Sequence, residues 1–195
     1  DRIDVLKWKG AVGFFDVTDL HKLFPGENYH TYMVHTRYAT RGRKDQLLED
    51  AHPHTIGGRI DHRGSHVLIL DCDAAMVHNG QVNDFFLEGL DKSLLKTSCD
   101  TEALLHFFIK NGERSVLEKI FGAYTMAVAV KERKEVCVLR DRTGIKPGML
   151  GWKDGKYGVA SEDIAYLGNS IEEVRKSVEK KEFKDKIRKA YKTIH

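Results

Sequence analysis

The chain has 195 residues, of which 41% are hydrophobic and 31% are charged, and its formal net charge is +3 at pH 7. These values predict a single globular domain and exclude a disordered or strongly polycationic chain. No apolar stretch reaches the roughly 20 residues of a membrane span, and no basic-then-apolar leader is visible, so we expect neither a membrane protein nor an exported one. Three cysteines without C-x-x-C spacing argue against a disulfide framework and favour the cytoplasm.

The first half of the chain predicts two short strands with a long loop between them. Thr31–Arg37 and His66–Leu70 are rich in β-branched and apolar residues, as strands are. The stretch Arg41–Gly64 is polar and punctuated by glycine, so it predicts a loop. Long ordered loops in compact domains are often functional.

The second half predicts helices followed by strands. The expected helices are Asp84–Leu90, a longer one that begins at Asp100 and has Gly112 just past its end, and Glu113–Ile120. The expected strands are Ala123–Val130, Glu135–Leu139 and Tyr157–Ala160. Because strands and helices are segregated along the chain instead of alternating, this order predicts an α+β architecture.

After residue 168 the sequence changes in character. From Ile171 to Ile194 apolar residues recur at helical spacing, and lysines and arginines occupy most other positions. We therefore expect a domain over residues 1–168 and a basic amphipathic helical tail over 169–195. The apolar stripe of the tail would pack on the domain or on a second subunit, which leaves a homo-oligomer open. A basic surface for nucleic acid or anionic lipid is the alternative, although nucleic acid is not the expected partner.

The segment His35–Gly42 ends a predicted strand with guanidinium and hydroxyl groups. Arg37 and Thr40 belong to it, and such groups hold a carboxylate or phosphate through charge-assisted hydrogen bonds. The segment therefore predicts either an anion site or a simple surface ion pair.

The tripeptide His78–Gly80 allows two interpretations. Asn-Gly is a turn signal, so a hairpin turn is the simpler one. In the other, the Asn79 side-chain amide and the Gly80 backbone N–H point together into a cleft. Two donors aimed at one point are what a tetrahedral oxyanion needs, and glycine lets the main chain approach a substrate closely.

Asp100 stands where a helix is predicted to begin. It can be the N-cap of that helix, or its carboxylate can receive the ammonium group of a ligand. Arg37 and Asp100 together would recognise the two charges of a free amino acid. No metal is expected, because the clustered histidines lack a helical H-x-x-x-H or a cysteine pair. These histidines are His52, His54, His62 and His66.

Seven short motifs follow one another in the order seen in class II glutamine amidotransferase domains. They are His35–Gly42, Ala51–His54, His78–Gly80, Cys99–Glu102, Gly122–Tyr124, Arg140–Pro147 and Ala160–Glu162. Together they span about residues 30–168 and resemble most the amidophosphoribosyltransferase-like branch of the family. The motif Arg140–Pro147 is also similar to that of asparagine synthetases.

The resemblance implies an N-terminal-nucleophile hydrolase fold, a four-layer αββα sandwich of two antiparallel sheets. It implies hydrolysis of the side-chain amide of L-glutamine to glutamate and ammonia, without a cofactor. Arg37, helped by Thr40, would hold the α-carboxylate, and Asp100 would hold the α-ammonium. Asn79 and Gly80 would form the oxyanion hole. The ammonia would pass to a synthase or other acceptor on a partner subunit.

The sequence departs from the family in its nucleophile, which there is a cysteine at the mature N-terminus, whereas residue 1 is Asp1. Cys99 stands where the family usually has serine, and Cys72 and Cys137 lie in or beside strand-like runs and are expected to be buried and inert. The enzyme interpretation therefore requires a cysteine upstream of Asp1.

Two alternatives to the enzyme follow from this departure and from the tail. One is a glutamine-binding module without a nucleophile that regulates a partner, and the other is a basic interaction module acting through the tail. A further departure is the insertion-like stretch Thr55–Leu70, which is expected to form a lid or a docking surface.

Overall fold

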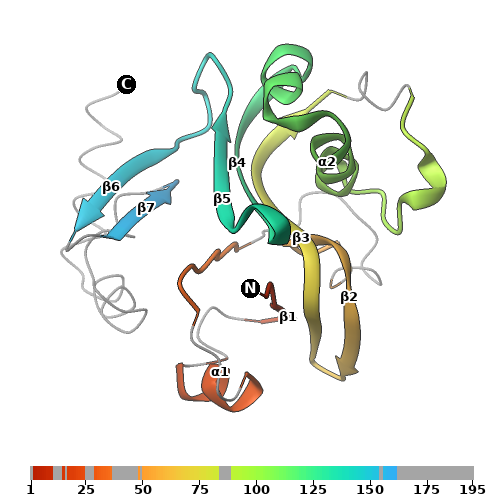
Figure 1. Cartoon of the computed structure of the whole chain (residues 1–195), viewed down its shortest axis with the longest axis vertical. Coiled ribbons are helices and arrows are strands. Elements are labelled where there is room, and N and C mark those ends of the chain that lie inside the picture. Colours follow the sequence, from red (N-terminus) through yellow and green to blue (C-terminus); the bar gives the residue numbers. More distant parts are fainter. Residues whose placement is uncertain are drawn as a thin grey trace. The chain divides into compact units, whose positions relative to one another are not determined.

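The computed structural model describes residues 2–10, 15, 17–24, 29–36, 48, 50–83, 89–153 and 156–161. The chain divides into two compact units. The first consists of Asp1–Phe14 with Asn28–Lys146, and the second of Phe15–Glu27 with Pro147–His195. Figure 1 labels the elements of both units, which are described separately below.

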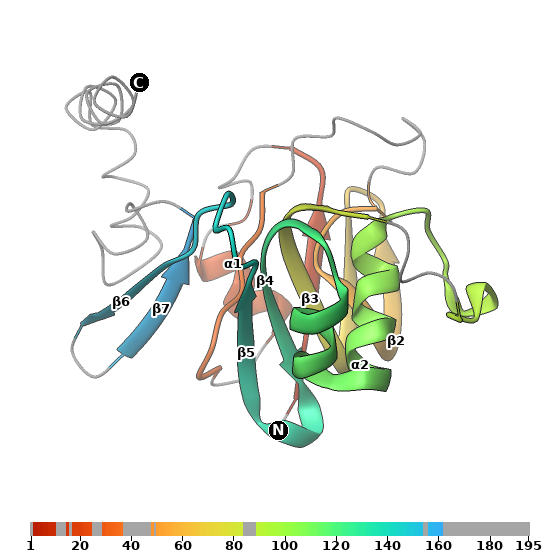
Figure 2. The same cartoon turned by 90° about the horizontal axis from the view of Figure 1, so that it is seen from above.

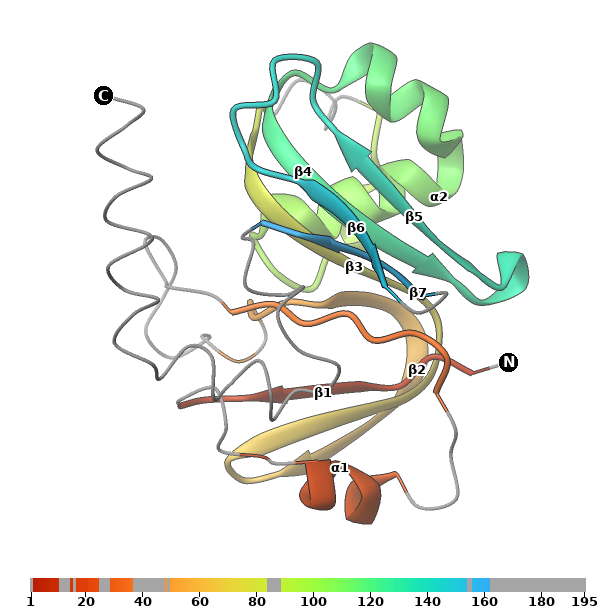
Figure 3. The ribbon, with the colours of Figure 1, turned by 90° about the vertical axis from the view of Figure 1, so that its left-hand side faces the viewer.

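The described residues of the first unit form a five-stranded antiparallel sheet. Its strands are β1 (Val5–Trp8), β2 (His54–Arg63), β3 (His66–Val82), β4 (Gly122–Val130) and β5 (Glu135–Arg140). The order is β1-β3-β4-β5, and β2 also pairs with β3. The 17-residue strand β3 is therefore shared by three neighbours. Figure 3 shows β1 alongside the hairpin of β2 and β3.

Helix α2 (Asp100–Lys119) covers one face of this sheet (Figure 2). It bends at Gly112, whose φ of 78° is readily adopted only by glycine. The helices predicted to end at Gly112 and to begin at Glu113 are thus both confirmed, as the two arms of one kinked helix. The 3₁₀ turns η2 (Lys92–Leu94) and η3 (Lys131–Arg133) precede α2 and connect β4 to β5, respectively.

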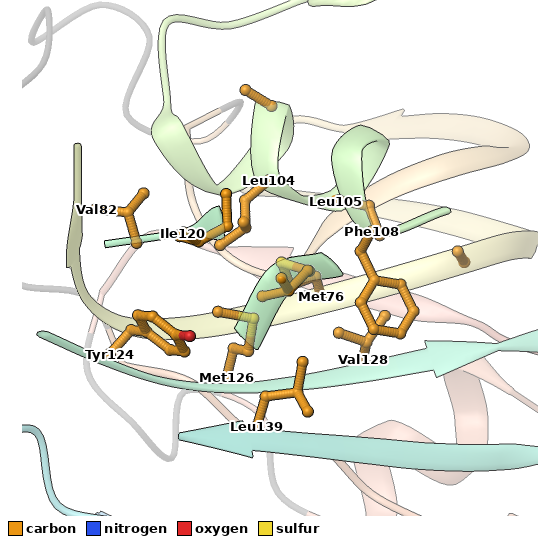
Figure 4. Packing of buried hydrophobic residues seen from close by; sticks show 13 residues of the cluster. Met76, Val82, Leu104, Leu105, Phe108, Ile120, Tyr124, Met126, Val128 and Leu139 are labelled. Atoms are coloured by element: carbon orange, nitrogen blue, oxygen red, sulfur yellow. The ribbon is translucent and has the colours of Figure 1, made fainter. Parts of the chain in front are cut away.

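The main hydrophobic cluster lies between α2 and the sheet (Figure 4). Phe108, Leu104 and Leu105 come from α2 and are fully buried. They pack with inward-facing residues of β3, β4 and β5 that include Met76, Met126, Val128 and Leu139. The strands predicted over Ala123–Val130 and Glu135–Leu139 are confirmed as β4 and β5. Burial alternates along β4, and Leu139 is the buried residue of β5, so both apolar runs supply side chains to the core.

Strand β3 contributes to a second hydrophobic cluster through its other face. Ala74 and Met76 belong to the main cluster, whereas Ala75 packs with Val5 of β1 and with Cys72. Successive residues of a strand point to opposite faces. From Ala74 onward, even-numbered residues of β3 therefore face the main cluster, and odd-numbered residues face the second one. The expectation that Cys72 is buried is confirmed, whereas Cys137, which was also expected to be buried, is only partly buried.

The second unit contains helix α1 (Val17–Leu23) and a hairpin of β6 (Met149–Lys153) and β7 (Lys156–Ala160). The strand predicted over Tyr157–Ala160 is confirmed, and β1, α1 and β6 had not been predicted. The described chain is thus a mixed α/β structure with two antiparallel sheets and few helices. No helix among the described residues is long and apolar enough to cross a membrane.

The predicted loop over Arg41–Gly64 is wrong for its second part. Residues His54–Arg63 form β2 and pair with β3, with a shift of register between Ile56 and Gly57. Most side chains of β2 are exposed, so its sequence lacks the alternation that marks a half-buried strand. The insertion-like stretch Thr55–Leu70 is accordingly a β-hairpin that turns at Gly64 and Ser65.

The strand predicted over Thr31–Arg37 is also wrong where the structure describes it, because Thr31–Thr36 belong to no strand. Tyr32 and Val34 are about two-thirds exposed, at 66% and 67%, so their apolar side chains do not lie on a buried sheet face. β-propensity becomes a strand only where a partner strand and burial support it.

Two further predictions lie outside the described residues. They are the helix over Asp84–Leu90, of which only Gly89 and Leu90 are described and lie in a turn, and the amphipathic tail over 169–195. The boundary after residue 168 therefore stays a prediction.

Candidate functional site

The tripeptide His78–Gly80 is part of a strand. The predicted hairpin turn is wrong, because Asn79 pairs with Thr125 and Gly80 with Tyr124 in the β3–β4 ladder. Gly80 has a φ of 146°, and a Cβ added to it would lie 2.0 Å from the carbonyl oxygen of Ala123. The close approach of two strands therefore requires glycine here, whatever else its N–H does.

The side chain of Asn79 is half-buried. Alternation places it on the face of β3 opposite that of its buried neighbour His78. Within the described part of the chain, no hydrogen bond occupies the Asn79 side-chain amide. This amide is therefore available to a ligand.

Asp100 is the first residue of α2, and the residue at the N-cap is Cys99. The prediction that Asp100 is the N-cap is therefore wrong by one position. The carboxylate of Glu102 accepts hydrogen bonds from the backbone N–H groups of Lys96 at 3.0 Å and of Thr97 at 2.7 Å. The Thr97 hydroxyl in turn accepts from the Cys99 N–H at 3.2 Å. Glu102 and Thr97 thus order the segment that leads into α2, and the Asp100 carboxylate takes no part in these hydrogen bonds.

Asp100 is half-buried, and among the described residues its carboxylate has weak contacts only. The Thr101 hydroxyl lies 3.4 Å from its Oδ1, and the Cys99 thiol lies 3.7 Å from the same atom. No ion pair of Asp100 occurs among the described residues. A partly desolvated carboxylate without a cation favours binding of a positively charged ligand group.

A hydrogen-bonded cluster of His52, His78 and Thr101, which we call the clamp, joins the end of β3 to the first turn of α2. The backbone N–H of His78 donates to His52 Nδ1 over 3.2 Å. The Thr101 Oγ1 lies 3.1 Å from both His52 Nε2 and His78 Nδ1. His78 and Thr101 are buried, at 4% and 1% exposure, and burial is the main cause that lowers the pKa of His78.

The hydrogen bond to His52 fixes the tautomer of its ring. Because Nδ1 accepts a hydrogen bond from a backbone N–H, it carries no proton, and the proton of the neutral imidazole is on Nε2. In the sequence, His52 was marked by the histidine cluster and by the motif Ala51–His54, but neither signal predicted a hydrogen-bonding role for it.

A metal is the other use that these histidines suggest. Donor atoms of His52, His54 and Cys99 lie within 4.8 Å of one another, and two imidazoles with a thiolate suit Zn²⁺. The Nε2 of His52, 4.0 Å from the Cys99 sulfur, carries a proton in the tautomer described above. A metal-bound histidine has the opposite arrangement, with its other ring nitrogen donating a hydrogen bond. The hydrogen bonding therefore disfavours a metal at this position.

The described cysteines differ in their surroundings. Burial raises the pKa of Cys72 to about 12, and burial is also the main cause that raises the pKa of Cys137. Only the thiolate is a nucleophile, so these two thiols are suited to a structural role. Cys99 is half-buried beside Asp100.

The motif Arg140–Pro147 forms a loop held by a buried carboxylate. Asp141 accepts hydrogen bonds from the backbone N–H groups of Tyr124 at 2.9 Å, Thr143 at 2.9 Å and Gly144 at 2.8 Å. The hydrogen bond from the Thr143 side chain is the largest of several causes that lower the pKa of Asp141 to about 2. The loop is thereby attached to β4 at Tyr124, the register partner of Gly80.

The structure connects the two elements that carry part of the predicted site. Asn79 and Gly80 are on β3, and Asp100 follows the residue that caps α2. The clamp connects the two elements. Arg37 and Thr40, the predicted carboxylate ligands, lie outside the described residues.

An available carboxylate and an available amide at neighbouring ends of a strand and a helix define a candidate site for a small ligand with a positive charge. The sequence family described as glutamine amidotransferase domain matches residues 60–195. The chain belongs to this family, as the motifs predicted.

Two relatives are similar over much of the chain. A putative glutamine amidotransferase of Methanothermobacter thermautotrophicus is 22% identical over 181 residues, which cover 83% of this chain and 51% of the relative. The amidophosphoribosyltransferase of Bacillus subtilis is 30% identical over 141 residues, which cover 68% of this chain and 27% of the relative. The chain therefore spans about half the length of the first relative and about a quarter of the second.

Proposed function

We propose that this chain is the glutamine-hydrolysing part of a class II glutamine amidotransferase, which converts the side-chain amide of L-glutamine to glutamate and ammonia. The observation that carries the proposal is the membership of residues 60–195 in the glutamine amidotransferase domain family. The geometry supports it, because a carboxylate and an amide with the required chemistry are both available.

The described residues of the site would bind two different parts of glutamine, its α-ammonium group and its side-chain amide. Asp100 would bind the α-ammonium group, and this role is supported by the position of Asp100 after the N-cap residue Cys99 and by the use of Glu102, not Asp100, as acceptor for the backbone before the helix. Asn79 and Gly80 would donate to the oxygen that becomes negatively charged in the tetrahedral intermediate. Arg37 and Thr40 would hold the α-carboxylate, as their guanidinium and hydroxyl groups allow.

The nucleophile would be a cysteine that is not among the 195 residues. The pKa values of Cys72 and Cys137 are raised, which opposes thiolate formation. Cys99 adjoins Asp100, so it would lie at the ammonium end of bound glutamine, several bonds away from the amide carbon. The thiolate of the nucleophilic cysteine would attack the amide carbon of glutamine. Ammonia would leave, and water would hydrolyse the resulting thioester to glutamate.

The wider assembly follows from the same proposal. The fold would be completed as a four-layer αββα sandwich, and the ammonia would pass to a synthase or acceptor on a partner subunit in the cytoplasm. The tail over 169–195 would pack on this domain or on a second subunit.

The test uses the full-length gene product with L-glutamine. We expect release of glutamate and ammonia, and binding of glutamine by calorimetry. Binding without turnover would favour the regulatory module instead, and absence of both would refute the proposal. Salt-sensitive nucleic-acid binding that is lost on deletion of 171–195 would favour the basic interaction module.

A further inference from the structure

We propose that His52 is a positioning residue that holds the Asn79–Gly80 strand end and Asp100 at the separation glutamine requires. The inference deepens the proposed function and rests on it. It assigns a role to a histidine whose two hydrogen-bond partners, His78 and Thr101, lie 26 and 49 positions away in the sequence.

The first contact of His52 fixes the strand. Its Nδ1 accepts the backbone N–H of His78 over 3.2 Å, and His78 is bonded directly to Asn79. Anchoring the main chain at position 78 restricts the position of the next peptide unit, which bears the Asn79 side chain and leads to the Gly80 N–H. Oxyanion donors must lie within about 2.7–3.1 Å of the developing charge, so small displacements matter here.

The second contact fixes the helix. His52 Nε2 lies 3.1 Å from the Thr101 hydroxyl, and Thr101 follows Asp100 in the first turn of α2. Since the proton of His52 is on Nε2, the ring donates to Thr101 while it accepts from His78. One neutral imidazole therefore satisfies a donor on β3 and an acceptor on α2 at the same time.

The clamp is closed by a third contact and held by its surroundings. His78 Nδ1 lies 3.1 Å from the same Thr101 hydroxyl, so the strand and the helix also meet directly. The ring of His35 lies over that of His52, with centroids 4.2 Å apart and planes inclined by 30°. These contacts restrict the rotation of His52 and make the clamp a defined geometry, which positioning requires.

The kinetic test compares variants of His52 in the full-length protein. His52→Ala removes both contacts, and we expect kcat for glutamine hydrolysis to fall by about 10- to 100-fold, because a displacement of the order of 1 Å at a reacting centre has such an effect. His52→Asn keeps an acceptor near the place of Nδ1, and His52→Gln keeps a donor near the place of Nε2. Each is expected to recover part of the lost rate. His62→Ala, at an exposed histidine of β2, is the matched control and should leave kcat and KM unchanged.

A double-mutant cycle separates positioning from general destabilisation. Thr101→Val removes the hydroxyl with little change in size, and Thr101→Ser restores it. If the clamp acts as a unit, His52→Ala combined with Thr101→Val should lower kcat no further than either change alone. Strictly multiplicative effects, or values of kcat within twofold of the wild type for His52→Ala, would overturn the inference.

An independent readout needs no activity. In the ¹⁵N NMR spectrum of the full-length protein, His52 should be the neutral tautomer with its proton on Nε2. A proton on Nδ1 would contradict the clamp and would make His52, His54 and Cys99 a credible zinc site, detectable by titration with Zn²⁺ alone. If the tautomer is as expected but the wild type neither binds nor hydrolyses glutamine, the proposed function fails. If the wild type is active and the His52 variants match it, only the positioning role fails.

Discussion

Two carboxylates in the first turn of α2 differ in what they bind. Glu102 is buried and accepts backbone hydrogen bonds from Lys96 and Thr97. Asp100, two residues earlier, makes only long contacts within the part of the chain that the structure describes. The backbone N–H groups before α2 thus bind the Glu102 carboxylate and leave the Asp100 carboxylate for a ligand, although both residues belong to the same motif.

Removal of the charge at Asp100 should weaken glutamine binding. A hydrogen bond to a charged group contributes about 1.5–3 kcal/mol, so Asp100→Asn should raise the Kd for glutamine by about 10- to 100-fold. Calorimetry on the full-length protein measures this. Asp73→Asn, at an exposed aspartate of β3, is the control. Equal Kd values for both variants and the wild type would show that Asp100 does not bind the ammonium group.

Removal of the Asn79 amide should affect turnover more than binding. Loss of one oxyanion donor lowers kcat by about 10²- to 10³-fold, so Asn79→Ala should lose turnover while the Kd for glutamine changes little. Steady-state kinetics and calorimetry distinguish the two effects. Asn111→Ala serves as the control, because Asn111 is exposed and bonds only within α2. A change in Kd without a change in kcat would remove Asn79 from the oxyanion hole.

At the scale of elements, β3 and β4 carry the site only because they approach closely at Gly80. The segment has the sequence of a turn, yet the strand continues to Val82, where the backbone of Gly122 completes the ladder. Asn-Gly was ambiguous because glycine serves both tight turns and close strand contacts. The pairing of β3 with β4 decides between these two uses. The local sequence around Asn79 and Gly80 carries no information about that pairing.

Gly80→Ala should therefore destabilise the ladder. The backbone conformation alone costs about 1–3 kcal/mol for a residue with a side chain, and the added Cβ would clash with the Ala123 carbonyl oxygen. Denaturant unfolding measures the loss of stability. Gly64→Ala is the matched control, because Gly64 also has a positive φ, of 65°, but no atom within 4 Å of an added Cβ. If both variants lost the same free energy of unfolding, the contact between the added Cβ and the Ala123 carbonyl oxygen would not be destabilising.

At the scale of the whole molecule, stability should depend on pH through His78. Burial lowers its pKa in the folded state below the usual 6.5, although the charge of Asp100 partly offsets this. Below about pH 6.5 the unfolded chain therefore binds more protons than the folded chain does. The free energy of unfolding should decrease in that window, which is distinct from the more acidic one in which Asp141, with a pKa of about 2, becomes protonated.

Denaturant unfolding between pH 7 and pH 5 checks this expectation. His78→Gln cannot titrate, so its stability should decline less steeply over that range than that of the wild type. His62→Ala, at an exposed histidine, should retain the wild-type slope. A wild-type stability that rises on acidification would reverse the sign of the argument and disprove it.

The sequence predicted those parts of the molecule whose signal is local. The apolar runs of β4 and β5 and the two arms of α2 were readable, whereas the exposed strand β2 was not, because pairing with β3 stabilises it. In the candidate site, the roles proposed for Asn79 and Asp100 follow from residue type and stay predictions. The clamp was not, since its three residues come from positions 23 to 49 apart and only the fold reveals their hydrogen bonds.

Cys72 offers a way to observe the strand that carries Asn79. Its thiol is fully buried within β3, and its raised pKa leaves almost none of it ionised at neutral pH. An alkylating reagent can therefore reach it only when this part of the sheet opens. The rate of covalent labelling, followed by mass spectrometry, would report the opening of the central strand, and slower labelling in the presence of glutamine would link that opening to occupancy of the site.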